Sequence, residues 1–173
     1  MTKKFSKLNW WQVAIVAIVV SAIGGLSAGK TSRKEIKLYT KKLKQAPWAP
    51  PAWIFAPAWT INNYFLLRAL QNILNSSMDE KKKILLLQAS IWTIFFSFNY
   101  IYFNKKSSIL AAIWTMGDAA LAISSFLLLM KEDKRTSLNF LPLVVWTSFA
   151  STIAGYQALK NPDPVLNTKA LLN

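Results

Sequence analysis

The sequence contains no cysteine and no histidine among its 173 residues. A chain without cysteine forms no disulfide scaffold and no thiolate metal site. Without histidine or cysteine it also has no Ser-His or Cys-His nucleophile pair and no imidazole zinc site. Acidic residues are scarce, with 7 Asp and Glu against 21 Lys and Arg, which gives a net charge of +14. We therefore expect no metal site and none of the enzyme classes that depend on such groups.

The charged residues leave long stretches of the chain uncharged. Hydrophobic residues make up 53% of the chain and charged residues only 16%, against about 25% charged in a typical globular domain. An α-helix needs about 20 mostly apolar residues to cross a bilayer. Five stretches fit that length, and Asp118 is the only charge within them: Trp10–Ala28, Pro47–Leu67, Ile84–Asn104, Ser107–Met130 and Thr136–Leu159.

This pattern predicts an all-α membrane protein, a single domain over residues 1–173 that forms a five-transmembrane-helix bundle. The helices are expected at about 8–29, 48–74, 83–104, 107–130 and 137–160. We expect a multi-pass protein of a bacterial cell membrane or an organelle membrane. The loop at 30–46 is the most basic one, so the positive-inside rule predicts an outer N-terminus and an inner C-terminus.

Three alternatives fit the pattern less well. A soluble helical protein would show one apolar stripe and one charged face on each helix, but these stretches are apolar all round. A nucleic-acid-binding protein would gather its basic residues on one helix or strand. Here they lie in loops between apolar stretches, as expected of loops that face lipid headgroups, so no nucleic-acid partner is expected. A cleaved signal peptide has a core of about 7–15 residues, shorter than the first stretch, which we expect to be retained.

Some local signals add detail. The spacing Gly25-x-x-x-Gly29 predicts a close approach of another helix. Pro57 lies inside the second stretch and predicts a kink. The polar segment after Asn161 is expected to fray. Asp118 is costly at mid-span and indicates either a structural hydrogen bond to a neighbouring helix or a polar cavity.

Aromatic and small residues share helical faces in the later stretches. Small residues leave room and aromatic rings offer flat walls, so these faces together could enclose a flat apolar pocket. Such stripes are also typical of ordinary helix packing, and the spacing leaves both interpretations open. The sets are Phe55, Ala56 and Trp59; Asn99 and Tyr102; Trp114, Gly117, Asp118 and Leu121; and Trp146, Ala150 and Ile153.

The run from Leu43 to Trp59, with Pro47-Trp48-Ala49-Pro50-Pro51 at its centre, resembles the signature of the TspO/MBR family. This family comprises the tryptophan-rich sensory proteins and the peripheral-type benzodiazepine receptors, also called translocator proteins. Its pattern has a second Trp eleven residues after the first, as Trp48 and Trp59 stand here. The later spacings also agree, at Asn99, Trp114 and Asp118 and at Trp146, Ala150 and Asn161. The resemblance covers about residues 10–161, with departures at Ala46, Asn63, Tyr102 and Ala154 that bear on ligand preference.

The resemblance implies a homodimeric five-helix receptor or translocator-like protein that regulates the handling of porphyrin, haem or, in some members, a sterol. It implies no obligatory cofactor and a pocket that the loop at 30–46 covers. Two alternatives stay open: a transporter of another small molecule, and a light-dependent porphyrin-degrading enzyme acting through Trp59 and Trp146. The implied pocket residues are Phe55, Ala56, Trp59, Asn99, Tyr102, Trp114, Gly117, Asp118, Leu121, Trp146, Ala150 and Ile153.

Overall fold

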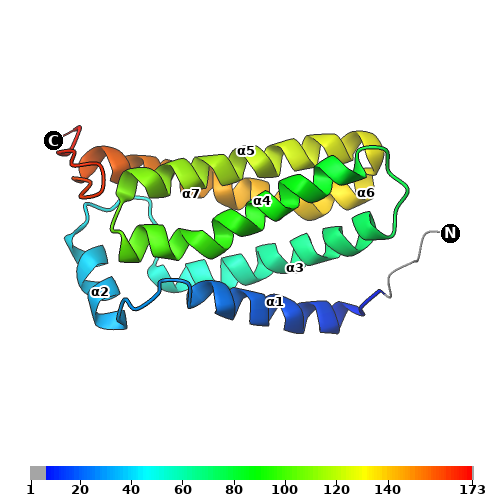
Figure 1. Ribbon diagram of the computed structural model, residues 1–173, viewed down its shortest axis with the longest axis horizontal. Coiled ribbons are helices and arrows are strands. Elements are labelled where there is room, and N and C mark those ends of the chain that lie inside the picture. The colour runs from blue at the N-terminus through cyan, green and yellow to red at the C-terminus, as the bar shows by residue number, and fades with distance from the viewer. Residues whose placement is uncertain (1–6, 173) are drawn as a thin grey trace.

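The computed structural model describes residues 7–172. Within these residues the chain is helical, and its only β-type pairing is one isolated bridge between Asp163 and Thr168. The long helices run side by side along one axis (Figure 1). The helices are α1 (Trp10–Gly25), α2 (Arg33–Lys42), α3 (Phe55–Leu74), α4 (Lys81–Asn99), α5 (Ser108–Glu132), α6 (Lys134–Ser137) and α7 (Leu141–Lys160).

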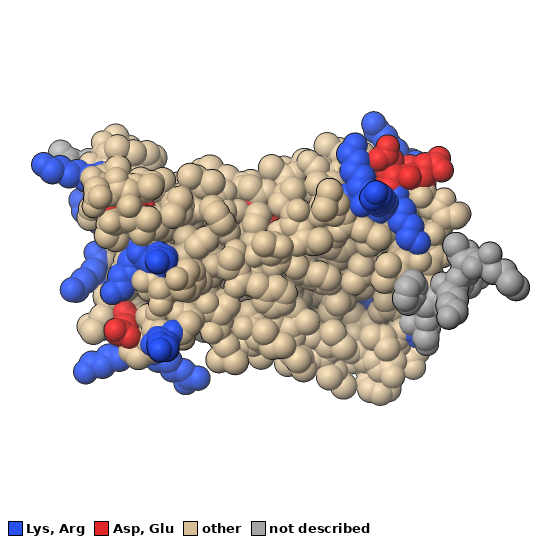
Figure 2. Space-filling view, in the orientation of Figure 1, with Lys and Arg blue, Asp and Glu red and all other residues tan. Residues whose placement is uncertain are grey.

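The prediction of an all-α protein with helices suited to a membrane is confirmed. Three helical stretches are long and apolar enough to cross a bilayer, Lys81–Asn104, Ser108–Glu132 and Lys134–Lys160, and Trp10–Gly25 is a shorter apolar helix. On the face shown in Figure 2, charged side chains gather at the two ends of the bundle and leave a nearly uncharged band between them. The α3 helix does not reach the same hydropathy, because Asn62, Asn63 and Arg68 lie along it.

Prolines set the start of α3 later than the sequence pattern suggested. Pro50 and Pro51 have no backbone N–H, and a 3₁₀ turn over Ala52–Ile54 leads into the helix, which begins at Phe55. Pro57 is therefore the third residue of α3. The amide that proline lacks would have no intrahelical acceptor in a first turn, so the expected cause of a kink is absent.

The α2 helix lies within the segment that was expected to be a loop. Its first turn is closed by a capping box. The Glu35 amide donates to Ser32 Oγ at 3.2 Å, and the Ser32 amide donates to Glu35 Oε2 at 2.8 Å. Tyr39 anchors the helix to the bundle, because its hydroxyl donates to the carbonyl of Lys106 at 3.0 Å. Burial raises the pKa of Tyr39 above its usual value.

The close approach of α1 to another helix occurs at Gly24 rather than at Gly25 or Gly29. A Cβ atom on Gly24 would lie 2.3 Å from the Phe95 ring of α4, whereas a Cβ on Gly25 would meet nothing within 4 Å. Gly29 lies beyond the helix with a φ of 68°. The prediction from the Gly25-x-x-x-Gly29 spacing is therefore wrong in position, because the phase of α1 turns Gly24 toward α4.

The two ends of the bundle have different cores. We call the end that carries α2 the α2 end and the end that carries α6 the α6 end (Figure 1). At the α2 end the buried cluster consists of Ala112, Ala154 and Ala158, between α5 and α7. The larger cluster, which extends from mid-bundle to the α6 end, contains Leu66, Ala69, Ile73, Ile84, Ile91, Ala122, Leu129, Phe140 and Leu143.

The segment after Asn161 is fixed rather than frayed. The buried Asp163 accepts a hydrogen bond from the Ser107 hydroxyl at 2.6 Å and from the Ile109 amide at 2.9 Å, and so caps the start of α5. The amides of Val165 and Leu166 also donate to this carboxylate. Burial alone would raise the pKa of Asp163, but these hydrogen bonds outweigh it and hold the pKa below its usual value.

Candidate functional site

Aromatic rings of α3 contact rings of α4 and α7 inside the bundle. The Phe55 ring lies edge-on to Trp146, with ring centroids 5.4 Å apart. One turn further along α3, Trp59 lies 5.0 Å from Phe95 of α4. The predicted residues Phe55, Trp59 and Trp146 thus form two aromatic contacts on one stretch of α3. Phe95 was missed, although its position four residues before Asn99 was a signal in the sequence.

The predicted residues of α5 have separate contacts. Trp114 is tied to α4, because its Nε1 donates to Ser97 Oγ at 2.9 Å. Gly117 faces Ile94, whose Cδ1 would lie 3.8 Å from an added Cβ. Leu121 packs against the large aliphatic cluster together with Trp59. These side chains brace α4 against α5.

Asp118 is only 2% exposed, and its Oδ1 atom receives no hydrogen bond from the described residues. A buried polar atom in a native structure normally has a partner, and a charged group within a membrane span is costly without one. A purely structural aspartate would be bonded to a neighbouring helix. The hydrogen bond to a neighbouring helix that a structural role requires is therefore not seen at Oδ1 in the described part of the chain.

The spacing of Asn99 and Tyr102 suggested that they share one helical face, but the structure places them on different faces. Asn99 Nδ2 donates to the carbonyl of Gly24 on α1 at 2.8 Å, and the Tyr102 hydroxyl donates to Gln157 Oε1 on α7 at 2.8 Å. The cause is a π turn over Tyr100–Asn104 at the end of α4, in which the Lys105 amide donates to the carbonyl of Tyr100. A π turn contains an extra residue, so residues three apart turn toward different neighbours.

The remaining predicted residues lie on α3 and α7. Ala56 is exposed on α3, Ala150 is half-buried on α7, and Ile153 is buried on α7. The structure therefore brings Phe55, Trp59 and Trp146 close together and distributes the other predicted residues over several helix contacts.

A segment of residues 43–50, which we call the strap, crosses the α2 end. The Lys44 amide donates to Asn161 Oδ1 at 2.8 Å, and Asn161 Nδ2 donates back to the Lys44 carbonyl at 3.1 Å. Gln45 bonds to Gln157, which also accepts from Tyr102. The side chains of Asn161 and Gln157, one turn apart on α7, therefore hold the strap.

Trp48 makes the second attachment of the strap. Its Nε1 donates to Thr152 Oγ1 at 3.0 Å, and its ring lies edge-on to Tyr156 at 5.4 Å. The sequence patterns did not select Gln45, Gln157 or Tyr39. Gln157 could have been found, because it stands on one helical face with Asn161 of the family spacing.

A groove of about 480 Å³ lies between α3 and α7 on the flank of the bundle. Of the predicted site residues, Trp146 lines it. Two of the lining side chains carry a buried N–H without an acceptor, Asn62 at Nδ2 and Trp146 at Nε1. The groove is lined by Ala58, Ile61, Asn62, Phe65, Leu138, Leu141, Pro142, Val145 and Trp146.

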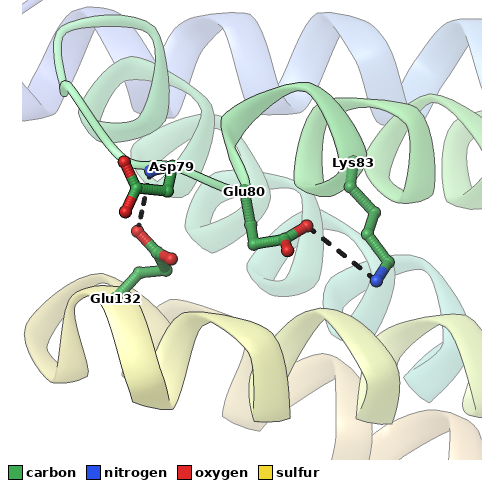
Figure 3. A network of polar contacts seen from close by, with 4 residues as sticks. All are labelled: Asp79, Glu80, Lys83 and Glu132. Atoms are coloured by element: carbon green, nitrogen blue, oxygen red, sulfur yellow. Dashed lines mark hydrogen bonds and ion pairs between the residues drawn. The ribbon is translucent and has the colours of Figure 1, made fainter.

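A polar hollow of about 470 Å³ at the α6 end involves acidic residues. Figure 3 shows that the Asp79 amide donates to Glu132 at 3.0 Å and that Glu80 pairs with Lys83 at 3.9 Å. No group of His, Cys, Asp or Glu among the described residues is arranged to hold a metal ion. The bond from Asp79 to Glu132 fastens the turn between α3 and α4 to the end of α5.

Comparison with known proteins agrees with the tryptophan and proline pattern. The sequence model of the TspO/MBR family matches residues 14–159. The tryptophan-rich protein TspO of Chlorobaculum tepidum is 24% identical over 129 residues, which cover 73% of this chain and 82% of that protein. The resemblance predicted from the residues is confirmed.

Proposed function

This chain belongs to the TspO/MBR family, and we propose that it binds a tetrapyrrole, a porphyrin or haem, between its membrane-spanning helices and regulates how that molecule is handled. Family membership supports a receptor or translocator-like role in a membrane. The tetrapyrrole, the number of spans and assembly as a homodimer are parts of the proposal.

In the proposed architecture five segments cross the bilayer: α1, α3, α4, α5 and the run from α6 through α7. Two polar residues of α3 are compatible with a span because they lie inside the bundle. Asn62 and Asn63 are both buried, and Asn63 Nδ2 donates to Ser21 Oγ of α1 at 3.0 Å. Polar side chains inside a membrane bundle are expected to face its interior and bond across helices.

The observation that carries the proposal is the aromatic wall that Phe55, Trp59 and Trp146 form. The Phe55 ring lies edge-on to Trp146 of α7, and Trp59, one turn further along α3, contacts Phe95 of α4. Large flat side chains suit a flat, mostly apolar guest. A porphyrin ring has this shape.

The positive charge at the α2 end supports a guest that carries carboxylates. The segment from Lys30 to Lys44 carries many basic residues and one acid, Glu35, and Figure 2 shows Lys and Arg side chains crowding the α2 end. Lysine and arginine form strong charge-assisted hydrogen bonds with carboxylates. The ring would lie against the aromatic wall, its propionates near the basic segment, with the strap across the opening.

The proposal is tested by titrating the detergent-solubilised protein with protoporphyrin and following quenching of tryptophan fluorescence. We expect saturable 1:1 quenching that is weakened about tenfold or more in Trp59→Ala and in Trp146→Ala, because each change removes part of the wall. The control is Trp53→Ala, since Trp53 is 72% exposed and lies on the outer surface. Quenching that does not saturate, or equal affinity in all three variants, would overturn the proposal.

A further inference from the structure

We propose that the groove between α3 and α7 is a second ligand site, which binds a neutral, hydrocarbon-tailed molecule with a flat carbonyl-bearing ring, the chemistry of an isoprenoid quinone. The groove opens on the flank of the bundle. Ile61 and Val145 on its two sides are 54% and 62% exposed, in the uncharged part of the molecule that would face lipid. A ligand would therefore reach it from within the bilayer.

Two donors in the groove give the ligand its chemistry. Asn62 Nδ2 comes from α3 and Trp146 Nε1 from α7, and neither has an acceptor among the described residues. The hydrocarbon core of a bilayer offers no water to satisfy such groups, so each unpaired N–H is costly. Both N–H groups are covered by neighbouring atoms, so a ligand in the groove would reach them only when the Asn62 and Trp146 side chains turn toward it. A ligand with carbonyl oxygens supplies what both groups lack.

Depth argues against the ester group of a phospholipid. At a rise of 1.5 Å per residue, Trp146 lies about 18 Å from Lys134 and about 21 Å from Lys160, at opposite ends of the spanning stretch. Trp146 is thus near mid-bilayer, whereas ester carbonyls lie about 15 Å from the middle, at the edge of the hydrocarbon core.

Charge argues against an acidic ligand. None of the residues that line the groove is charged, and a carboxylate at this depth would be left without a cation. A fatty acid held wholly within the groove is disfavoured there. What remains is a neutral ligand with an acceptor.

The aromatic side chains of the groove indicate that the ligand contains a flat ring. Phe65 of α3 lines the groove and offers an aromatic ring on which a flat ring can stack, while Trp146 of α7 would donate through the edge of its indole. A quinone carries two carbonyls, one for each donor. Its tail would lie along the exposed Ile61 and Leu141 and continue into the bilayer. A volume of about 480 Å³ suits one substituted ring and a short part of the tail.

The test uses the full chain in phosphatidylcholine nanodiscs with a decyl-substituted benzoquinone that carries ¹³C at its carbonyls. We expect saturable binding and a carbonyl stretch shifted to lower frequency by hydrogen bonding. Asn62→Leu should weaken binding about tenfold, the equivalent of one lost hydrogen bond, and return one carbonyl band to its free position. Ala58→Phe, which fills the groove without changing its polarity, should abolish binding.

Trp92→Phe is the matched control for Trp146→Phe, because Trp92 Nε1 is also buried and unpaired but Trp92 does not line the groove. Only Trp146→Phe should weaken quinone binding. Equal binding in Asn62→Leu, or equal binding of a decylbenzene without carbonyls, would overturn the inference and leave a groove for lipid tails. Loss of porphyrin binding in Ala58→Phe would also overturn it, because the groove would then be the tetrapyrrole site. Failure of porphyrin binding in wild type, with quinone binding intact, would affect the proposed function alone.

Discussion

The α6 end and the α2 end of this bundle are held together by different forces. At the α6 end, large aliphatic side chains and Phe140 pack without exposure. At the α2 end, the buried cluster consists of three alanines, and hydrogen bonds with Asn161, Gln157 and Trp48 hold the strap. Burial of large apolar groups is lost only when helices separate, whereas a single hydrogen bond contributes about 1 kcal/mol. The comparison indicates that one end maintains the fold and the other can open to admit a ligand.

The largest loss of stability should come from truncating a core side chain at the α6 end. Leu129→Ala removes a side chain that is 0% exposed, and such a change typically costs about 2–5 kcal/mol because a cavity remains. We expect a clear loss of stability in denaturant titrations in mixed micelles, with unchanged porphyrin affinity of the folded protein.

Leu127→Ala, two residues away on the same helix, is the matched control because Leu127 is exposed. It should have little effect. Equal losses in the two variants would contradict the idea that this core maintains the fold.

A methyl group on Gly24 tests how tightly the α2 half is packed around Phe95. Gly24→Ala should cost about 1–3 kcal/mol, because the new Cβ overlaps the ring. Gly25→Ala should be neutral or slightly stabilising, since nothing lies near that position and alanine favours helix. Thermal unfolding of both variants in the same detergent gives the difference, and a harmless Gly24→Ala would show that α1 can move away from α4.

Releasing the strap should open the α2 end without unfolding the bundle. Asn161→Ala removes both bonds to Lys44, so we expect amide hydrogen exchange at residues 43–50 to rise about tenfold or more, and porphyrin to associate faster. Asn104→Ala serves for comparison, because the Asn104 side chain bonds to Thr31 at the same end and not to the strap among the described residues. If exchange in the strap is the same in both variants, Asn161 is not what holds it.

The smallest effect is confined to acid pH. The pKa of Asp163 is held below its usual value by hydrogen bonds, so its stabilising contribution is complete above about pH 4 and is lost as the pH falls through the folded-state pKa. We expect limited proteolysis after Asn161 to accelerate in that range. Asp163→Asn should remove the pH dependence, and a dependence that persists in this variant would place the titration elsewhere.

The sequence was sufficient where the signal is local. Uncharged length predicted membrane-spanning helices, and three of the stretches form helices long and apolar enough to cross a bilayer. The run around Trp48 predicted the family, which is confirmed. The α2 helix was also accessible, because Ser32 and Glu35 have capping-box spacing. Contacts across the bundle were not accessible. Which of two adjacent glycines faces α4 depends on a rotation of about 100° per residue, and the bond between Asp163 and Ser107 joins residues far apart in sequence.

The residues of the candidate site also divide into those that local sequence spacing predicted and those that it did not. Periodicity identified Phe55, Trp59 and Trp146, whose rings do meet in contacts between helices. It misplaced the pair Asn99 and Tyr102, because an α-helical spacing was applied across the π turn that follows α4. The unpaired N–H groups of Asn62 and Trp146 result from how α3 and α7 come together, and no spacing rule reports them.

Because of the π turn at Tyr100–Asn104, the neighbours that the side chains after α4 contact depend on the number of residues in this turn as well as on their types. Deleting one amino acid there would let an ordinary α turn form. The downstream side chains would rotate by about a quarter of a turn or more, and the tyrosine that now meets Gln157 would point elsewhere. A single-codon deletion could therefore remove the bond between Tyr102 and Gln157 while leaving every tryptophan in place.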